Sequence, residues 1–146
     1  MGKKIVLTEQ QVYKLLESME MDEMGRAKLA CTYANFHQVS EYLRGKSSRK
    51  IGYETYIEKL SNFEVGIKYH RTHIVKMDVT DVMTISSGGW DTPTTKDRLN
   101  QFLSCRGVHI YQKKFEWFIV GTNDTLPFVD GMQVFPNGHV AAPAKG

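Results

Sequence analysis

The chain has 146 residues, of which 41% are hydrophobic and 24% are charged, and its formal net charge is +3. These values exclude a disordered or fibrous protein and fit one domain over residues 1–146. The charge is uneven, because residues 26–114 carry 15 Lys and Arg against 8 Asp and Glu, a net of +7. Residues 1–25 and 115–146 each carry a net of −2. This distribution predicts a positive face suited to a polyanion.

The N-terminal third predicts two helices. A capping box at residues 8–11 is followed by hydrophobic residues at helical spacing, so residues 9–20 should form an amphipathic helix. A second helix is expected over residues 22–45, with a break near Asn35. The apolar run at residues 5–7 is too short for a signal peptide, and no stretch is long enough to span a membrane. We therefore expect a cytoplasmic protein without a membrane partner.

The remainder of the chain predicts strands around one inserted helix. Residues 46–50 are polar and basic and are typical of a mobile arm or a solvated linker. Four strands are expected from their β-branched and aromatic residues: 69–77, 82–86, 108–112 and 115–120. The last two form either a hairpin or one long ribbon, and a flexible tail should begin at about residue 136. The expected class is α+β, with two N-terminal helices followed by a mainly antiparallel β-sheet with one inserted helix.

The segment 86–101 predicts a turn and a helix start that attracts anions. Gly88 and Gly89 allow positive φ angles, and the following hydroxyl and proline residues suit a helix N-terminus at about residue 93. Lys96 and Arg98 oppose the helix macrodipole there, which favours a nearby phosphate. A nucleotide-hydrolysing P-loop is excluded because no Gly-Lys-Ser/Thr follows at the required spacing.

Aromatic and basic residues alternate along residues 111–118, a pattern typical of proteins that bind single-stranded nucleic acid. Bases stack on aromatic rings while Lys and Arg follow the phosphate backbone. The alternative is that the aromatic residues form a core face and the lysines are solvated. The predicted nucleic-acid site comprises Arg49, Lys50, Tyr69, Arg71, Trp90, Lys96, Arg98, Tyr111, Lys113, Lys114, Phe115 and Trp117.

Other chemistries have little support in the sequence. Cys31 and Cys105 have no metal-binding spacing and are expected to be buried thiols, with a disulfide as the alternative. His70 and His73 would face opposite sides of one strand, so we expect no shared metal. A helix-turn-helix over residues 29–46 lacks the usual turn glycine. We therefore expect no catalytic residues, no metal or cofactor, and no enzymatic activity.

The sequence resembles a family of small bacteriophage proteins over residues 69–132. The resemblance rests on Ser87-Gly88-Gly89-Trp90, on Thr94-Thr95-Lys96 with Arg98 and Asn100-Gln101, and on the flanking stretches 69–75, 108–118 and 127–132. The family is largely without an assigned function. Within it, the chain is similar to the Drc-type cofactors of short-tailed phages, which bind single-stranded DNA and RNA polymerase.

The resemblance and the residue pattern together predict a phage protein of the bacterial host cytoplasm. It would bind single-stranded DNA in a sequence-tolerant manner during phage transcription or replication. RNA polymerase is an implied partner, and a homo-oligomer is expected because repeated sites increase avidity. The alternative is a host-takeover or anti-defence protein that binds and inhibits a bacterial protein, with the aromatic residues as interface anchors.

Overall fold

The first described helix, α3 (Phe36–Leu43), begins at a local capping signal. The structure is a computed structural model that describes residues 32–144. The Asn35 side chain accepts a hydrogen bond from the Gln38 backbone N–H at 2.9 Å, which satisfies one amide at the helix start. The helix ends at Arg44 and Gly45, both with positive φ angles. The predicted break near Asn35 is confirmed.

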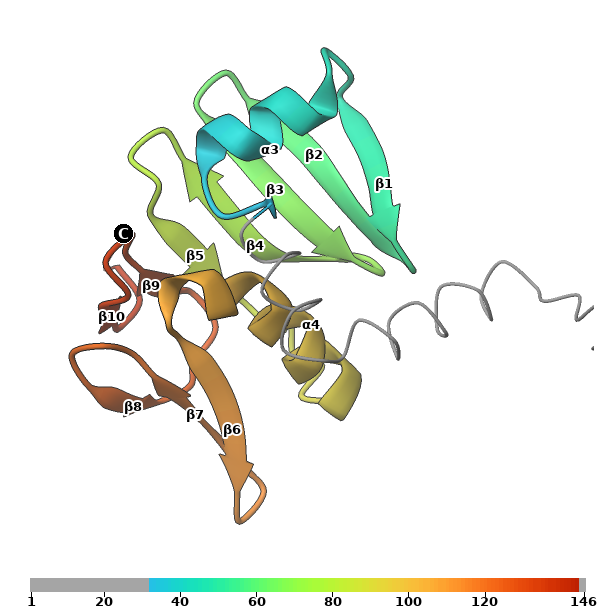
Figure 1. The fold of residues 1–146 in the computed structure, drawn as a ribbon. Helices are drawn as coiled ribbons and strands as arrows, with labels where there is room; N and C mark the ends of the chain where they lie inside the picture. The colour runs from blue at the N-terminus through green and yellow to red at the C-terminus, as the bar shows by residue number, and fades with distance from the viewer. Residues whose placement is uncertain (1–31, 145–146) are drawn as a thin grey trace, which may run out of the picture.

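Seven strands form one antiparallel sheet in the order β1-β2-β3-β4-β5-β9-β10 (Figure 1). Its strands are β1 (Ser48–Gly52), β2 (Thr55–Ser61), β3 (Glu64–Tyr69), β4 (Thr72–Asp78), β5 (Met83–Ile85), β9 (Met132–Val134) and β10 (Val140–Ala141). Successive hairpins connect β1 to β5, whereas β9 and β10 return to the sheet from the end of the chain. The sequence predicts a flexible tail from about residue 136. The structure differs, because Val140 pairs with Val134 and so joins the end of the chain to the sheet.

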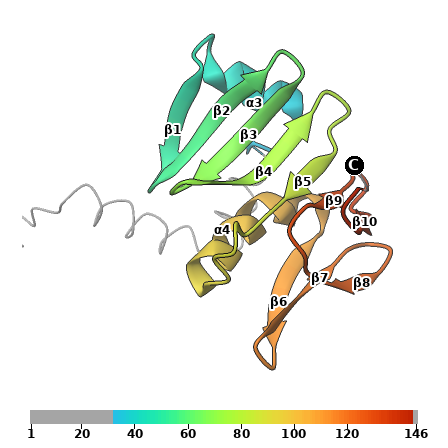
Figure 2. The same cartoon turned by 180° about the vertical axis from the view of Figure 1, so that it is seen from behind.

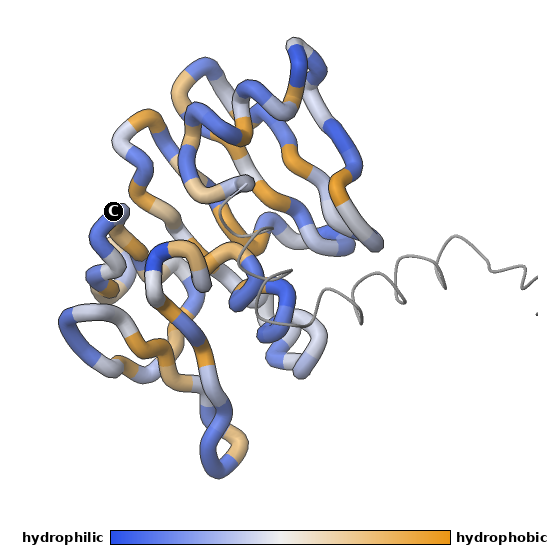
Figure 3. The backbone as a smooth tube through the Cα atoms, viewed as in Figure 1, coloured by the Kyte–Doolittle hydropathy of each residue, from blue (hydrophilic) through white to orange (hydrophobic). Residues whose placement is uncertain are grey.

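Helix α3 covers one face of this sheet because alternate strand residues are apolar. Ile57 on β2 and Ile67 on β3 are paired and fully buried, and Val39 and Leu43 of α3 are buried in the same core. Figure 3 shows hydrophobic and hydrophilic residues interspersed along these strands. The opposite face of β1, β2 and β3, seen in Figure 2, carries no helix among the described residues.

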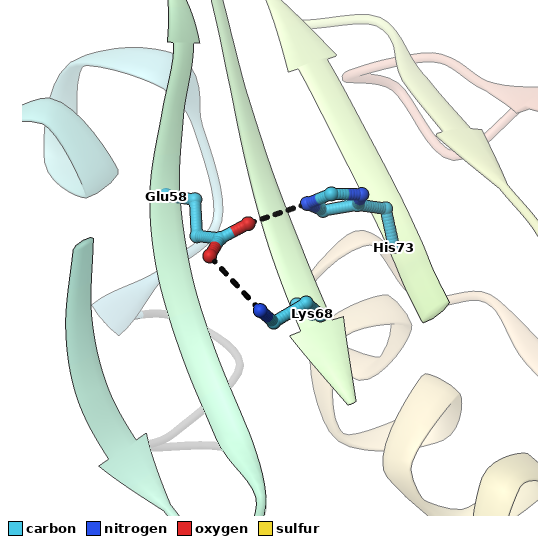
Figure 4. Close-up of polar contacts among 3 residues, drawn as sticks. All are labelled: Glu58, Lys68 and His73. Carbon is cyan, nitrogen blue, oxygen red and sulfur yellow. Dashed lines mark hydrogen bonds and ion pairs between the residues drawn. The ribbon is translucent and has the colours of Figure 1, made fainter. Parts of the chain in front are cut away.

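That opposite face holds a charged cluster on three neighbouring strands (Figure 4). The Glu58 carboxylate contacts His73 Nε2 at 2.6 Å and Lys68 Nζ at 3.2 Å. Burial alone raises the pKa of Glu58, but the hydrogen bonds and positive charge of these two partners outweigh it and hold the pKa below its usual value. The cluster therefore ties β2, β3 and β4 together across the sheet.

A second sheet of three strands packs through β6 on helix α4 (Pro93–Leu103), which continues into the 3₁₀ helix η1 (Ser104–Arg106). Its order is β6-β7-β8, with β6 (His109–Lys113), β7 (Glu116–Val120) and β8 (Thr125–Pro127). Figure 1 shows α4 between the two sheets. The helix buries Leu99, Phe102 and Leu103 completely, as their spacing predicts. Thr92 is its N-cap and Pro93 its first residue, which confirms the predicted start.

The predicted fold class is wrong in its helices and in its single sheet. Within residues 32–144 one short helix precedes the strands, and the strands divide into two sheets. The expected helix 9–20 lies outside the described residues. Residues 48–50, expected in a basic arm, belong to β1 because they pair with β2. The sequence of residues 46–50 itself contains no strand signal that predicts this pairing. The expected strand 69–77 is interrupted by a turn at His70, whose φ of 55° is left-handed.

Three further findings concern the cysteines, membrane-spanning helices and metal ligands. Cys105 is exposed and disulfide-bonded, so the expectation of a buried thiol is wrong at this position, and Cys31 lies outside the described residues. In the part of the chain that the structure describes, no helix is long and apolar enough to cross a membrane. Likewise, among residues 32–144 no three His, Cys, Asp or Glu side chains gather as a metal site would require.

Candidate nucleic-acid interface

The hairpin of β6 and β7 has one buried and one solvent-facing side. Directly opposed residues share a face of an antiparallel pair, and the faces alternate along each strand. Ile110 pairs with Ile119, and both are buried, as is Trp117 on the same side. The residues of the other side we call the outer face: His109, Tyr111, Lys113, Glu116, Phe118 and Val120.

Aromatic rings run along the outer face. Tyr111 and Phe118 are direct cross-strand partners, and their rings stack with centroids 5.5 Å apart and planes inclined by 24°. His109 lies one position along on the same face, with its ring centroid 6.2 Å from that of Tyr111. His109 is exposed, while Tyr111 and Phe118 are half-buried. The outer face therefore carries three neighbouring aromatic rings, and aromatic side chains are what the bases of a single strand stack on.

The hairpin tip adds two cations and a fully exposed ring. Lys113 pairs with Glu116, and the two residues between them, Lys114 and Phe115, form the turn. Both have positive φ angles, 50° and 67°, as a type I′ turn requires. Gly and Asn suit such angles, whereas a bulky residue is strained there. Phe115 is 95% exposed. A strained turn that presents an aromatic ring to solvent is a candidate contact for a ligand.

The hairpin is held firmly at its base, so the outer face is a fixed surface. The Asn100 side chain of α4 accepts from the Ile110 backbone N–H at 2.7 Å and donates to its carbonyl at 2.9 Å. These bonds satisfy the free edge of β6, which has β7 on its other side. Trp117 packs against Phe128 with ring centroids 5.5 Å apart. Figure 1 shows the tip projecting away from this support.

The twelve predicted site residues separate into four groups. Tyr111, Lys113, Lys114 and Phe115 meet on the β6–β7 hairpin, as predicted. Arg71 and Trp90 lie at a separate pocket beside the start of α4. Arg49 and Lys50 lie on the edge strand β1, where Arg49 donates to the Tyr42 carbonyl at 2.7 Å. Of the remaining four, Tyr69, Arg98 and Trp117 are buried, and Lys96 is half-buried.

Burial excludes Trp117 and Arg98 as contacts on an open surface, and it leaves Tyr69 only as a residue that lines a pocket. Trp117 is 7% exposed and belongs to the core, so its expected role as a stacking surface is wrong and the core alternative holds. Tyr69 is also buried, with the Arg98 guanidinium 5.1 Å from its ring centroid. Arg98 donates to the Gln101 side chain at 2.8 Å and is itself buried. These two residues stabilise the packing of α4 on the large sheet and are not open to a phosphate backbone. Lys96 is half-buried.

Two aromatic residues of the outer face, His109 and Phe118, were missing from the predicted site. Phe118 and His109 share a face with Tyr111 because β6 and β7 pair in this register. The signal for Phe118 is available in the sequence, since strand alternation places it opposite to Trp117 once Trp117 is assigned to the core. The same alternation along β6 places His109 on the face of Tyr111, because the two residues are two positions apart on one strand.

Comparison with known proteins places the chain among phage proteins. Residues 33–135 match the family described as Kyanoviridae Gp96 protein. The chain belongs to this family. Its matched region includes the outer face and most of both sheets. The predicted phage origin is therefore confirmed, whereas the narrower similarity to Drc-type cofactors stays a prediction. No curated protein and no solved structure matches the chain.

Proposed function

We propose that this Kyanoviridae Gp96 protein binds single-stranded DNA through the outer face, with little dependence on base order. The observation that carries the proposal is the stacked pair of Tyr111 and Phe118, flanked by His109 and by the lysines of the tip. Stacking is tolerant of sequence because every base has a flat face. The outer face and the tip together contain two lysines, Lys113 and Lys114, and one acidic residue, Glu116. Their net charge is positive and therefore favours binding of an anionic strand.

A duplex is a poorer ligand for this surface. Its bases are already stacked on one another, so aromatic rings on a sheet gain little from them, and only the phosphates remain open to the protein. We therefore infer a role in handling exposed single strands during phage transcription or replication in the host cytoplasm, as a binding protein rather than an enzyme. RNA polymerase as a partner and self-association remain part of this proposal.

Fluorescence anisotropy of labelled mixed-sequence DNA tests the proposal. We expect single strands to bind more tightly than duplex of the same length at two salt concentrations. Replacing Lys113 and Lys114 by alanine should weaken binding and reduce the salt slope by about 0.7 for each phosphate that a lysine no longer neutralises. The matched control replaces Lys59 and Lys76, two exposed lysines of the large sheet, and should leave the slope unchanged. Equal binding of duplex, or equal effects of the two double variants, contradicts the proposal.

A second candidate function has one specific observation in its favour. Phe115 is 95% exposed at a projecting turn, and such a residue also suits an anchor in a protein interface. A host-takeover or anti-defence protein would use the hairpin tip in this way. The two candidates differ in what Tyr111→Leu does, because replacing this ring by an aliphatic side chain removes base stacking while the tip is preserved. Loss of DNA binding in this variant favours the first candidate.

A further inference from the structure

A pocket of about 480 Å³ lies apart from the outer face, where the β3–β4 turn meets the segment before α4. Its volume falls within the range of small-molecule sites. Its lining includes Glu54, Tyr69, His70 and Arg71, together with Trp90 and Thr92 from the segment before α4. Residues distant in sequence therefore build its walls, and two stretches of the phage resemblance, 69–75 and 87–96, meet in it.

The pocket walls are held in place by local structure. Gly88 has a φ of 65°, and a Cβ there would lie 2.5 Å from Thr72 Cγ2, so the turn packs directly against β4. Asp130 accepts from the Ser87 backbone N–H at 2.7 Å and from its hydroxyl at 3.0 Å. On the other wall the His70 backbone donates to the Glu54 carbonyl at 2.7 Å. Close packing at Gly88 and these hydrogen bonds therefore fix the positions of the pocket walls.

Two residues of the pocket lining that are not glycine have left-handed backbone angles. Glu54 has a φ of 47° and His70 a φ of 55°, although neither residue favours that region as glycine does. Their side chains approach each other to 3.9 Å between His70 Nδ1 and Glu54 Oε2. Such strain persists where surrounding structure imposes it, and it is frequent at ligand sites.

The pocket lining combines an aromatic ring from Trp90, a cationic side chain from Arg71 and threonine hydroxyl groups. The Trp90 indole is 66% exposed, so most of its surface is open to a ligand. Arg71 is exposed and lines the same pocket, and Thr92 and Thr94 supply hydroxyl groups. The buried Tyr69 ring and Ile74 provide an apolar wall. A flat apolar ring together with an anionic group complements this combination.

We propose that this pocket binds a nucleotide, with the base against Trp90 and the phosphate at Arg71. The nucleotide is either free or the terminal residue of a strand, since both present the same base and phosphate. The site is separate from the outer face and does not depend on it, so either can fail without the other. An arginine suits the role because its planar guanidinium donates two hydrogen bonds to one phosphate.

Tryptophan fluorescence tests the proposal in a Trp117→Phe background, where Trp90 is the only remaining tryptophan of the chain. We expect AMP to quench this emission saturably, and adenosine and inorganic phosphate to bind more weakly than AMP. Arg71→Gln should weaken AMP binding at least tenfold, because the charged hydrogen bonds from the guanidinium to the phosphate are lost. Arg44→Gln is the matched control, because Arg44 is an exposed arginine at the end of α3 and should have no effect.

The outcomes separate the alternatives. Absence of saturable quenching, or equal affinity in the Arg71→Gln and Arg44→Gln proteins, overturns the proposal. Adenosine binding as tightly as AMP overturns the phosphate contact. A 5′-phosphorylated oligonucleotide that competes better than AMP assigns the pocket to strand ends, and the reverse order assigns it to free nucleotides. The DNA affinity of Tyr111→Leu, measured separately, reports on the outer face alone.

Discussion

Replacing the turn Lys114-Phe115 by Asn-Gly should make the protein more stable and a weaker DNA binder. Both residues have left-handed φ angles, which cost an L-residue roughly 1–2 kcal/mol, and Asn and Gly adopt them more readily. Phe115 is 95% exposed, so its removal sacrifices almost no buried surface. The added glycine destabilises the protein by about 0.5–1 kcal/mol, because glycine loses more conformational entropy on folding. The net gain should be about 1 kcal/mol.

The same variant removes one exposed ring and one lysine from the proposed interface. A stacked ring contributes about 1–3 kcal/mol to binding of a single strand. Affinity for mixed-sequence single-stranded DNA should therefore fall about 5-fold to 150-fold. The opposite signs are informative, because damage to the fold would lower both quantities together.

Thermal denaturation and DNA anisotropy measure the two effects on one preparation. A gain of about 1 kcal/mol should raise Tm by about 2–4 °C in a domain of this size. The single variant Lys114→Asn keeps the phenylalanine and should retain most of the affinity. A lower Tm for the double variant would refute the strain argument. A raised Tm with unaltered DNA affinity would remove Phe115 from the DNA interface and favour the protein-binding alternative.

Three further predictions concern the scaffold. Gly88→Ala should cost more stability than Gly89→Ala in urea denaturation, by about 1–3 kcal/mol, because both have positive φ but a Cβ meets neighbouring atoms only at Gly88; equal costs would contradict the packing described. The free energy of unfolding should decline as pH falls below the ordinary glutamate pKa, because the pKa of Glu58 is lowered in the folded protein. Glu58→Gln should make this decline at acidic pH shallower. An unchanged decline would argue against the stabilising role of the contacts that Glu58 makes with His73 and Lys68. Asn100→Ala should cost about 2–4 kcal/mol by leaving both backbone groups of Ile110 unpaired, and hydrogen exchange at β6 should rise; unchanged protection would refute this.

Local signals in the sequence were sufficient for some elements and not for others. Helix α4 was predictable because its cap, its proline and its buried stripe all lie within 92–103. Strand β1 was not, since its basic residues resemble a loop and only pairing with β2 makes them a strand. The turn at His70 was also hidden, because histidine gives no turn signal and the left-handed angle is imposed by its neighbours.

The candidate site was half predictable for the same reason. Alternating aromatic and basic residues identified the hairpin, but the pattern leaves open which aromatic side chain faces the core. Trp117 is buried and packs against Phe128, which directly follows the neighbouring strand β8, and strand alternation then places Phe118 on the other face. Arg98 resembled a phosphate ligand, yet it stacks on Tyr69 from the other sheet. Side-chain direction therefore depended on contacts made outside the element that carries each residue.

The outer face is the surface that we propose contacts single-stranded DNA, and its position on the molecule can be measured. An NMR titration of the full chain with a mixed-sequence single strand tests this most directly. We predict that amide shifts concentrate in residues 109–120 and are largest at Tyr111, Phe118 and the turn between β6 and β7. A duplex of equal length should give smaller shifts in the same residues. Shifts that are absent from residues 109–120, or that concentrate on the large sheet, would contradict the proposed interface.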